Sequence, residues 1–518
     1  MDVLELQRIR GTNDLIPPED AHLRELTRDL RAHFERYGYR GIDTPVIENL
    51  DLFLRKSGEE IAARMYTFTH WNRKLCLRPE FTASVMRAYV NHLQDRALPV
   101  RLHYAGATFR YEKPQRGRYR QFTEVGLECI GADGPAADAE VLAAACGALR
   151  AVGLRRYRLV VGHLGAVLEL LRQLGIGEHG QALILANMEH LARRRADPTE
   201  VIERVLALMG VGAAGDDETA DESSLLPTLL AEFGSKGAAD VAADLLSRAN
   251  LALEGGARTP EEIVRRLLTK AGRPDPTEQV RRAADFILRL HDLAGPPPEV
   301  FGHLDALLQE HGLDQAPLRA VREALSLFER YGVSGVDVTV DLSLGRGLRY
   351  YTGLVFELYH EGPPASRGRP APAGPSQICG GGRYDDLVRS LGGRDHAPAC
   401  GFSFGLERVK LALEAEGALP APAGEVDALV VPVAAEDVAD AIELARDLRE
   451  AGLAVELDVR LRGVKGNLRH ADRHGIPTVV IYGQQERDQR RPILRAMGLR
   501  QEHSVDRTEL VDAVRAAL

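Results

Sequence analysis

The 518-residue chain has few of the features that mark secreted, metal-binding or membrane proteins. It contains five cysteines, and no two of them have the Cys-x-x-Cys spacing of a zinc site or a redox motif. No run approaches the ~18 consecutive apolar residues that a membrane-spanning helix needs. The N-terminus, MDVLELQRIRG, lacks the basic-then-apolar pattern of a secretory signal. We therefore expect a soluble, cytoplasmic protein with buried free thiols, no membrane partner and no side-chain metal cluster.

The bulk composition allows a large core and nucleic-acid binding over part of the surface. Hydrophobic residues make up 45% of the chain, and its length suits roughly three domains. The formal net charge of −9 does not suit a protein whose whole surface binds nucleic acid, although it permits a local basic face. Arginines gather between Arg110 and Arg120, which predicts one such face.

Three stretches rich in acidic residues, small residues or proline divide the chain, at residues 211–224, 362–374 and 419–424. Before the first, Leu23, Leu26, Leu30 and Phe34 predict a helix that ends near Gly38. Strands are predicted at residues 43–48, 102–104, 124–130, 336–342 and 354–359. Residues 166–327 are mostly helical in period and predict a helical insertion.

After residue 424, strand and helix patterns alternate. Strands are predicted at residues 428–433, 454–457 and 478–482, and helices at 437–450 and 466–474. This alternation predicts a small α/β domain with a parallel or mixed sheet.

Residues 109–128 read FRYEKPQRGRYRQFTEVGLE, with a tight turn expected at PQRG. Arginines at the base of a strand-turn-strand hold planar donor groups at fixed spacing, which suits a polyphosphate. A solvated basic hairpin is the alternative. Glu124 and Glu128 are expected on one face of the returning strand, where they suit an ammonium or imidazolium group.

Three further segments carry candidate site residues. In LRPEFTASVMRA, Pro79 can start a helix with Glu80 and Thr82 exposed in its first turn, which is also an ordinary helix start. In RGLRYYTG, glycines beside Arg346 let its guanidinium point into a cavity, and Tyr350 and Tyr351 are expected on opposite sides of the next strand. The run Gly380, Gly381 and Gly382 permits a ligand to approach the backbone, or marks only a turn.

Together, and in this order, these segments resemble the motifs of the histidyl-tRNA synthetases, which are class II aminoacyl-tRNA synthetases. DTPVIE resembles motif one, FRYEKPQRGRYRQF motif two, and GFSFGLERVKL motif three, which carries Arg408. RGLRYYTG and GGGRYDDL resemble the two histidine motifs, and RIRGTNDLIP resembles the family's start. The resemblance covers residues 8–160, 336–413 and 426 to the C-terminus.

The resemblance implies an α/β fold of the α+β type, in which an antiparallel sheet is flanked by helices, with a helical insertion and a C-terminal α/β anticodon-binding domain. The implied division is residues 1–165 and 328–418 for the catalytic core, 166–327 for the insertion and 425–518 for the anticodon-binding domain. Motif one implies a homodimer.

The resemblance also implies a histidine–tRNA ligase that uses ATP and Mg²⁺ to form histidyl-adenylate and then transfers the histidyl group to tRNA(His). Arg110 would hold the α-phosphate and Arg408 the γ-phosphate. Glu112 would read the adenine amino group or hold metal, and Phe122 would stack on adenine. Arg346 would be the catalytic arginine that bridges the substrate carboxylate and the phosphate.

For histidine, the resemblance implies that Glu80 and Thr82 bind the α-ammonium group, beside Glu124. Glu128 and Tyr351, next to Tyr350, would bind the two imidazole nitrogens, so that a ring without both nitrogens leaves a buried group unpaired. Gly380, Gly381 and Gly382 would leave room for the ring. The tRNA would be bound by the following residues: Arg116, Arg460, Arg462, Lys465 and Arg469.

Two residues depart from the family pattern, since Arg349 replaces an Asp and Glu124 replaces a Gln. The pair could compensate each other, or could mark a site that has lost its ligand. The alternative function is that of a catalytically silent regulatory subunit of ATP phosphoribosyltransferase that binds histidine. The intact motif-two segment, Arg408 and the C-terminal domain favour the ligase.

The insertion either contacts the tRNA acceptor arm or only covers surface.

Overall fold

The computed structural model describes residues 7–57, 64–178, 180–182, 184, 276–344, 350–362, 376–420 and 426–518. The chain divides into two compact units, one of Met1–Asp14 with Leu26–Leu419 and one of Leu15–Glu25 with Pro420–Leu518. Among the described residues, none of the helices is long and apolar enough to cross a membrane.

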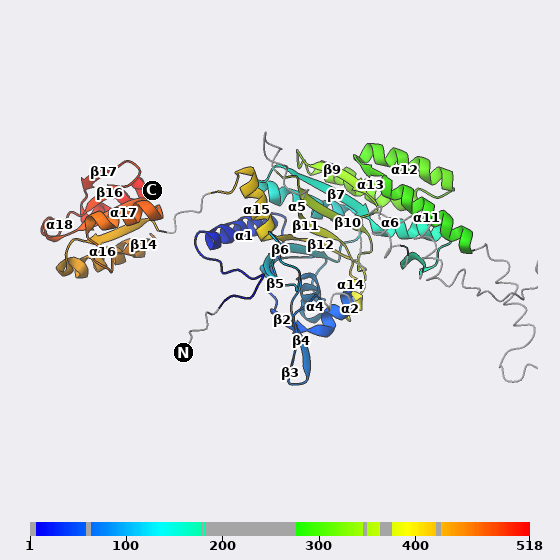
Figure 1. The fold of residues 1–518 in the computed structure, drawn as a ribbon, viewed down its shortest axis with the longest axis horizontal. Coiled ribbons are helices and arrows are strands. Elements are labelled where there is room, and N and C mark those ends of the chain that lie inside the picture. Colours follow the sequence, from blue (N-terminus) through cyan, green and yellow to red (C-terminus); the bar gives the residue numbers. More distant parts are fainter. Residues whose placement is uncertain are drawn as a thin grey trace, which may run out of the picture. The chain divides into compact units, whose positions relative to one another are not determined.

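The first unit is built on a mostly antiparallel sheet, which in its described part has nine strands (Figure 1). In spatial order they are β1 (Arg40–Gly41), β5 (Val100–Phe109), β6 (Gln121–Ile130), β12 (Ala399–Gly405), β11 (Ser376–Arg383), β10 (Leu354–His360), β7 (Tyr157–His163), β9 (Asp337–Asp341) and β8 (Ala294–Gly295). The run from β5 to β7 is antiparallel throughout, while β1 and β9 pair in parallel with β5 and β7. The predicted antiparallel core is confirmed, as are the strands expected at 102–104, 124–130, 336–342 and 354–359.

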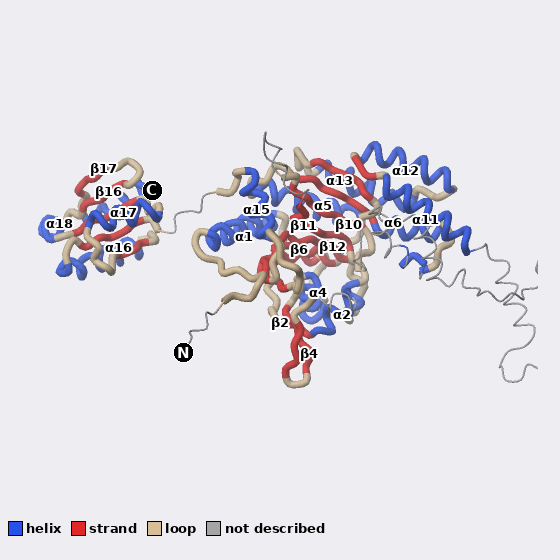
Figure 2. The backbone as a smooth tube through the Cα atoms, viewed as in Figure 1, coloured by secondary structure: helices blue, strands red, loops and turns tan. Residues whose placement is uncertain are grey.

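Helices cover both faces of this sheet (Figure 2). On one face, α1 (Glu19–Arg36) places Phe34 against Phe402 of β12, and α5 (Pro135–Ala151) also packs on β12. On the other face, α4 (Thr82–His92) and α14 (Leu387–Ser390) share an apolar cluster with Tyr104 of β5. The four residues that predicted α1 are all buried, so the helical period correctly identified its inner face.

A second sheet in this unit has the order β2 (Ile47–Asn49), β4 (Arg73–Leu77) and β3 (Thr67–His70), with α2 (Leu50–Ser57) following β2. The strand predicted at 43–48 is therefore wrong at its start, since it begins only at Ile47. Residues before it are bound instead by Arg78, whose guanidinium donates to the carbonyl oxygen of Thr44 and whose backbone N–H donates to that of Val46.

Register places the side chains of Ile47, Phe68, Leu75 and Leu77 on one face of this three-stranded sheet, because Ile47 pairs with Leu77 and Phe68 with Leu75. Ile47 and Phe68 remain 52% and 40% exposed. The β3–β4 hairpin extends away from the large sheet, with exposed Trp71 at its turn (Figure 1). The result is a sheet face with two exposed and two partly buried apolar side chains.

The described part of the predicted helical insertion is largely helical. It contains α6 (Leu164–Gln173), α11 (Pro276–Asp292), α12 (Pro297–His311) and α13 (Arg319–Arg330). The short strand β8 lies between α11 and α12 and pairs with β9, while α13 packs on α5. These helices are therefore integrated with the large sheet. Residues 185–275, the rest of the predicted insertion, lie outside the described residues.

The second unit has a mixed five-stranded sheet in the order β14 (Val455–Leu457), β13 (Ala428–Pro432), β15 (Thr478–Tyr482), β16 (Ile493–Ala496) and β17 (Gln501–Ser504). The first three strands are parallel, as expected from the alternation, and the last two are antiparallel. One face packs on α16 (Val438–Glu450) and α19 (Leu510–Ala517), and the other on α17 (Val464–His474). The apolar run of β13 is buried on both faces, which is why it does not alternate.

Candidate active site and nucleic-acid surface

One face of the central strands is rich in glycine. Six glycines fall on this face in neighbouring strands: Gly106 of β5, Gly126 of β6, Gly401 and Gly405 of β12, and Gly380 and Gly382 of β11. A Cβ atom added at Gly401 would collide with the Glu128 carboxylate, and one at Gly382 would lie 2.7 Å from the Tyr351 ring. The glycines thus form a floor over which larger side chains and a ligand can lie, and we call this face the glycine floor.

The predicted role of the three-glycine run is partly wrong. A Cβ atom at Gly381 would meet the side chains of Phe402 and Phe356, which form the core on the opposite face. Side chains alternate along a strand, so only Gly380 and Gly382 face the floor. The run is also an internal strand and not a turn.

Glu128 is fully buried at one end of the glycine floor, where two tyrosine hydroxyls donate to it. Tyr104 donates to Oε1 at 3.2 Å, and Tyr384 donates to Oε2. Burial, and then the charges of Glu128, Glu124 and Glu80, raise the pKa of Tyr104 well above its usual value, so this hydroxyl remains a donor. Glu128 was predicted here, whereas Tyr104 and Tyr384 were not, although both lie in segments that the sequence singled out.

The rings of Tyr350 and Tyr351 lie together, with centroids 4.4 Å apart, and both are about 6 Å from the Tyr384 ring. The prediction that they face opposite sides of a strand is wrong, because β10 begins only at Leu354. Both tyrosines precede the strand, where the alternation rule does not apply. Tyr351 nevertheless lies over Gly382, although it is not part of the strand.

Glu80 and Thr82 lie at the start of α4 and are half-buried, not exposed as predicted. The helix starts at Thr82 and not at Pro79, which is a second correction. The Glu80 carboxylate accepts from the backbone N–H of Ala83 at 3.2 Å, so an acidic group lies at the positive end of the helix. The carbonyl oxygen of Pro79 instead accepts a hydrogen bond from the Nε group of Arg110.

Arg110 and Glu124 form an ion pair in the middle of the site, with Nη2 and Oε1 2.7 Å apart. Glu124 is 3% exposed. The Arg110 Nε group also donates to the carbonyl oxygen of Pro79 at 2.8 Å, and its guanidinium lies 5.1 Å from the centre of the Phe122 ring. The predicted placement of Glu124 and Glu128 on one strand face is confirmed.

Arginines gather at the other end of the glycine floor. Arg408, in the first turn of α15 (Leu406–Glu416), donates to the carbonyl oxygens of Gly117 at 2.9 Å and Gln377 at 2.8 Å. Burial lowers the pKa of Arg408, and the charges of Arg118 and Arg110 lower it further. Glu112 compensates part of this charge through an ion pair with Arg118. We call Arg110, Arg118 and Arg408 the arginine cluster.

Backbone hydrogen bonds in both directions between Gln115 and Arg118 confirm the predicted tight turn, in which Gly117 has a φ of 73°. Arg118 was missed as a site residue, although it belongs to the quoted segment. Arg346 and Arg349 lie outside the described residues.

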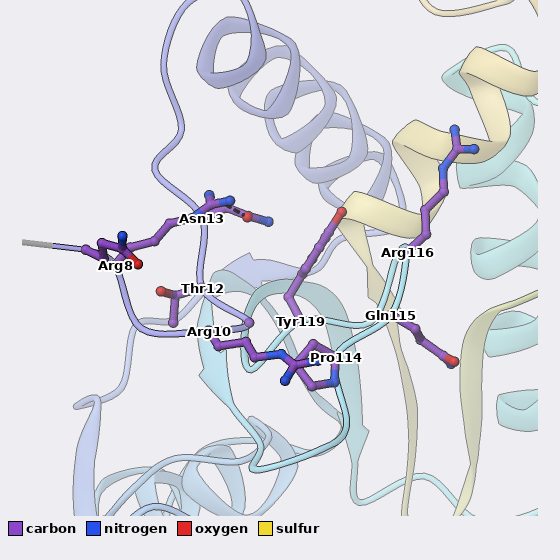
Figure 3. Close-up of a pocket in the computed structure, with 10 residues that line it drawn as sticks. Arg8, Arg10, Thr12, Asn13, Pro114, Gln115, Arg116 and Tyr119 are labelled. Atoms are coloured by element: carbon purple, nitrogen blue, oxygen red, sulfur yellow. Dashed lines mark hydrogen bonds between the residues drawn. The ribbon is translucent and has the colours of Figure 1, made fainter.

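A separate cavity of about 550 Å³ lies between the N-terminal segment and the 114–119 turn (Figure 3). Its lining includes Arg8, Arg10 and Arg116, for which no carboxylate partner exists among the described residues. Figure 3 shows the hydrogen bond from Arg8 to Asn13 and the Arg116 side chain extending away from that segment. The cavity thus has a basic rim beside the arginine-rich turn.

In the second unit, the predicted basic edge is a loop shaped by a buried carboxylate. Asp458 is 2% exposed and accepts from the backbone N–H groups of Arg460 at 3.1 Å and Arg462 at 2.8 Å, and from Asn467 at 2.7 Å. These bonds hold the loop so that Arg460 and Arg462, with Lys465 and Arg469 of α17, remain exposed.

Within the described residues, no three His, Cys, Asp or Glu side chains gather closely enough to hold a metal ion.

The comparisons with known proteins agree with this geometry. The family model described as histidyl-tRNA synthetase matches residues 11–229 and 237–409, and the model of the anticodon binding domain matches 427–517. The chain belongs to the histidyl-tRNA synthetase family. It is 32% identical to the histidine–tRNA ligase of Rhodococcus erythropolis over 97% of this chain and 96% of the relative, and 33% identical to that of Archaeoglobus fulgidus over 93% of each.

Solved structures give the same result. The structure of apo S. aureus histidyl-tRNA synthetase has a TM-score of 0.63 and 26% identity, covering 98% of this chain and all of that one. A Bacillus halodurans protein described as an ATP phosphoribosyltransferase regulatory subunit/histidyl-tRNA synthetase has a TM-score of 0.61 at 22% identity, which bears on the fold alone. As a member of the synthetase family, the chain is a histidine–tRNA ligase with a class II core and an anticodon-binding domain.

Tyr384→Phe should weaken histidine binding, because the buried Glu128 carboxylate loses one of the donors that orient it. We expect the KM for histidine to rise about tenfold, the scale of a missing hydrogen bond to a buried charge, while the KM for ATP stays within twofold. Tyr157→Phe is the matched control, since Tyr157 is also buried and donates to the carbonyl oxygen of Cys146 at 2.8 Å. Equal histidine KM values in the two variants would remove Tyr384 from the site.

Proposed function

We propose that the glycine floor is where this ligase joins histidine to ATP and then passes the histidyl group to tRNA(His). In the first step, a histidine carboxylate oxygen bonds to the α-phosphorus while the α–β phosphoanhydride bond breaks and pyrophosphate leaves. In the second, a hydroxyl of the terminal ribose bonds to the carbonyl carbon, loses its proton, and AMP leaves. The supporting observation is that the buried Glu128 and the arginine cluster share one sheet face.

The Glu128 end suits the imidazole ring. Tyr104 and Tyr384 orient the Glu128 carboxylate, which retains lone pairs that can accept from an imidazole N–H group. Tyr350 and Tyr351 would enclose the ring, with Tyr351 bonding its second nitrogen, above Gly380 and Gly382. Glu80, Thr82 and Glu124 would bind the α-ammonium group. In support, Glu80 and Glu124 both lie close enough to Tyr104 to raise its pKa, and Thr82 lies at the same helix start as Glu80.

The arginine cluster suits the triphosphate. Both the attacking carboxylate and the α-phosphate are anionic, so fixed cations are needed to stabilise the charge that develops at phosphorus. Arg110 would act at the α-phosphate and Arg408 at the γ-phosphate, with Arg118 beside them, and Phe122 would stack on adenine. Arg346, outside the described residues, remains our proposal for the catalytic arginine.

A magnesium ion bound to the triphosphate fits the end of the glycine floor where the arginine cluster lies. Mg²⁺ is usually held by one or two carboxylates plus substrate phosphates, and Glu112 and Glu407 both act on Arg408. These two residues would hold the ion, which would neutralise phosphate charge. Their present bonds, to Arg118 and to the backbone N–H of Thr123, would have to be shared. A role for Glu112 at the adenine amino group is the alternative.

We propose residues 1–165 and 328–418 as the catalytic core, 166–327 as an insertion and 425–518 as the anticodon-binding domain, in a protein that works in the cytoplasm. Because α11, α12 and α13 are integrated with the large sheet, we infer that the insertion extends the catalytic core.

The purified protein should catalyse ATP–pyrophosphate exchange only when histidine is present. We expect Arg346→Ala to lower kcat at least a hundredfold without changing the far-UV circular dichroism, because it removes charge stabilisation in the transition state. Exchange is measured with labelled pyrophosphate, and histidine is replaced by other amino acids as the control. Histidine binding without any exchange would contradict the ligase and favour the regulatory subunit.

For tRNA, we propose that Arg460, Arg462, Lys465 and Arg469 contact the phosphates of the anticodon arm. Their exposure and the loop held by Asp458 support this assignment. In the first unit, Arg116 would contact the acceptor end, beside the basic cavity that it lines with Arg8 and Arg10.

Replacing these four residues, Arg460, Arg462, Lys465 and Arg469, by Gln should weaken tRNA binding and flatten its salt dependence. The slope of log K against log[salt] should fall by about 0.7–0.9 for each phosphate that the protein no longer neutralises. Arg446→Gln is the control, since Arg446 lies on α16, which packs on the opposite face of the sheet. A slope equal to that of the unaltered protein would show that this loop does not contact phosphates.

We also propose a homodimer formed through the apolar face of the β2–β4–β3 sheet. Ile47 and Phe68 are exposed on this face, next to the partly buried Leu75 and Leu77, and exposed apolar surface of this kind marks protein–protein contacts.

Phe68→Lys should weaken the dimer at least tenfold, because full burial of a phenylalanine contributes about 1.5–3 kcal/mol and a lysine there would lose its hydration. Sedimentation equilibrium measures the dissociation constant. Thr69→Lys is the matched control, since the neighbouring side chain points to the other face of β3. A monomeric unaltered protein, or equal weakening by both variants, would contradict this interface.

A further inference from the structure

Three carboxylates, Glu80, Glu124 and Glu128, lie at the histidine end of the glycine floor, and the guanidinium groups of Arg110 and Arg78 both interact with Glu124. Glu80, Glu124 and Glu128 all lie close enough to Tyr104 for their charges to raise its pKa. Arg110 is paired directly with Glu124. With every group ionised, the three carboxylates outnumber the two guanidinium groups by one, so this end of the glycine floor favours a cationic ligand.

The Arg110–Glu124 pair lies at the boundary between this acidic region and the arginine cluster. Glu124 is flanked across the sheet by Gly106 and Gly405, which carry no side chain, and the Arg78 guanidinium lies over Gly106. Arg110 is 39% exposed and is also held by the carbonyl oxygen of Pro79. Arg110 is therefore fixed in place, while its charge is largely compensated by one buried carboxylate.

We propose that Glu124 couples the two substrate subsites, because it compensates the charge of Arg110 until the α-ammonium group of histidine binds to it. This inference rests on the proposed function. A carboxylate can accept from two cationic donors at once, so the ammonium group need not displace Arg110. Its charge cancels that of Glu124, and the positive potential of Arg110 then acts on the phosphate.

The physical consequence is cooperative binding without a large movement. ATP should bind weakly to the free protein, where a buried anion lies beside the phosphate-binding arginine. It should bind more tightly once an ammonium group occupies the acidic region. Thermodynamic linkage requires the reverse effect to be equal, so ATP must strengthen amino-acid binding by the same factor.

The coupling can be measured with histidinol, which carries the ammonium group and the imidazole ring but no carboxylate, and so cannot be adenylated. Isothermal titration calorimetry gives the Kd of ATP with and without saturating histidinol. We expect histidinol to tighten ATP binding about tenfold, within the usual range of coupling between sites. In contrast, 4-methylimidazole, which has the ring alone, should leave the Kd of ATP within twofold.

The decisive variant is Glu124→Gln, which keeps the shape of the side chain and removes its charge. ATP alone should bind this variant several-fold more tightly than the unaltered protein, and histidinol at saturation should add less than twofold. Glu140→Gln is the matched control, because Glu140 pairs with Arg101 at 2.9 Å, and Arg101 points to the opposite side of β5 from Tyr104. It should keep the full coupling.

Equal effects of histidinol and 4-methylimidazole on the unaltered protein would overturn the proposal, and this test does not depend on any variant folding. Full coupling in Glu124→Gln would overturn it as well. The proposed function fails separately, through absence of histidine-dependent exchange. If exchange occurs without coupling, only the proposed role of Glu124 is rejected. If coupling occurs without exchange, Glu124 keeps this role in a protein that binds both ligands but does not join them.

Discussion

The site depends on a steric constraint, the glycine-rich face of the central sheet. Glycine weakens strands, since it loses more backbone entropy and offers no side chain to pack. In this protein the opposite face supplies that packing, with Phe356, Phe402 and Phe404 buried together in the core. The sheet is thus stabilised from one side, while on the other side Gly401 and Gly382 make room for the side chains of Glu128, Tyr384 and Tyr351.

Charge is separated along this open face. Carboxylates lie at one end and arginines at the other, although the whole chain carries a net charge of −9. Histidine brings a cation and a carboxylate, and ATP brings a polyanion, so each end of the floor is complementary to one substrate. Arg110 and Glu124 meet at the boundary, where the bond between the two substrates would form. Electrostatic preorganisation of this kind requires groups held by burial and by backbone contacts, as both residues are.

The second unit has its own core and presents its charged residues in a different way. Two apolar clusters lie on opposite faces of one sheet and form its core, and the buried Asp458 shapes the loop that carries the basic residues. A short loop held by a carboxylate keeps long cationic side chains on the surface without a cost to the core. The basic residues of the second unit are therefore carried by a part of the chain with its own core.

The sequence alone determined the local features, because they depend on neighbours in the chain. Helical period placed the buried face of α1, strand alternation placed Glu124 and Glu128 on one face, and the order of motifs identified the family. Only the tertiary structure decided which distant groups meet. Strand register brings Tyr104 and Tyr384 to Glu128, turns Gly381 toward the core and pairs Arg110 with Glu124. These contacts join residues as far apart as 128 and 384, and no local pattern specifies a register between such distant strands.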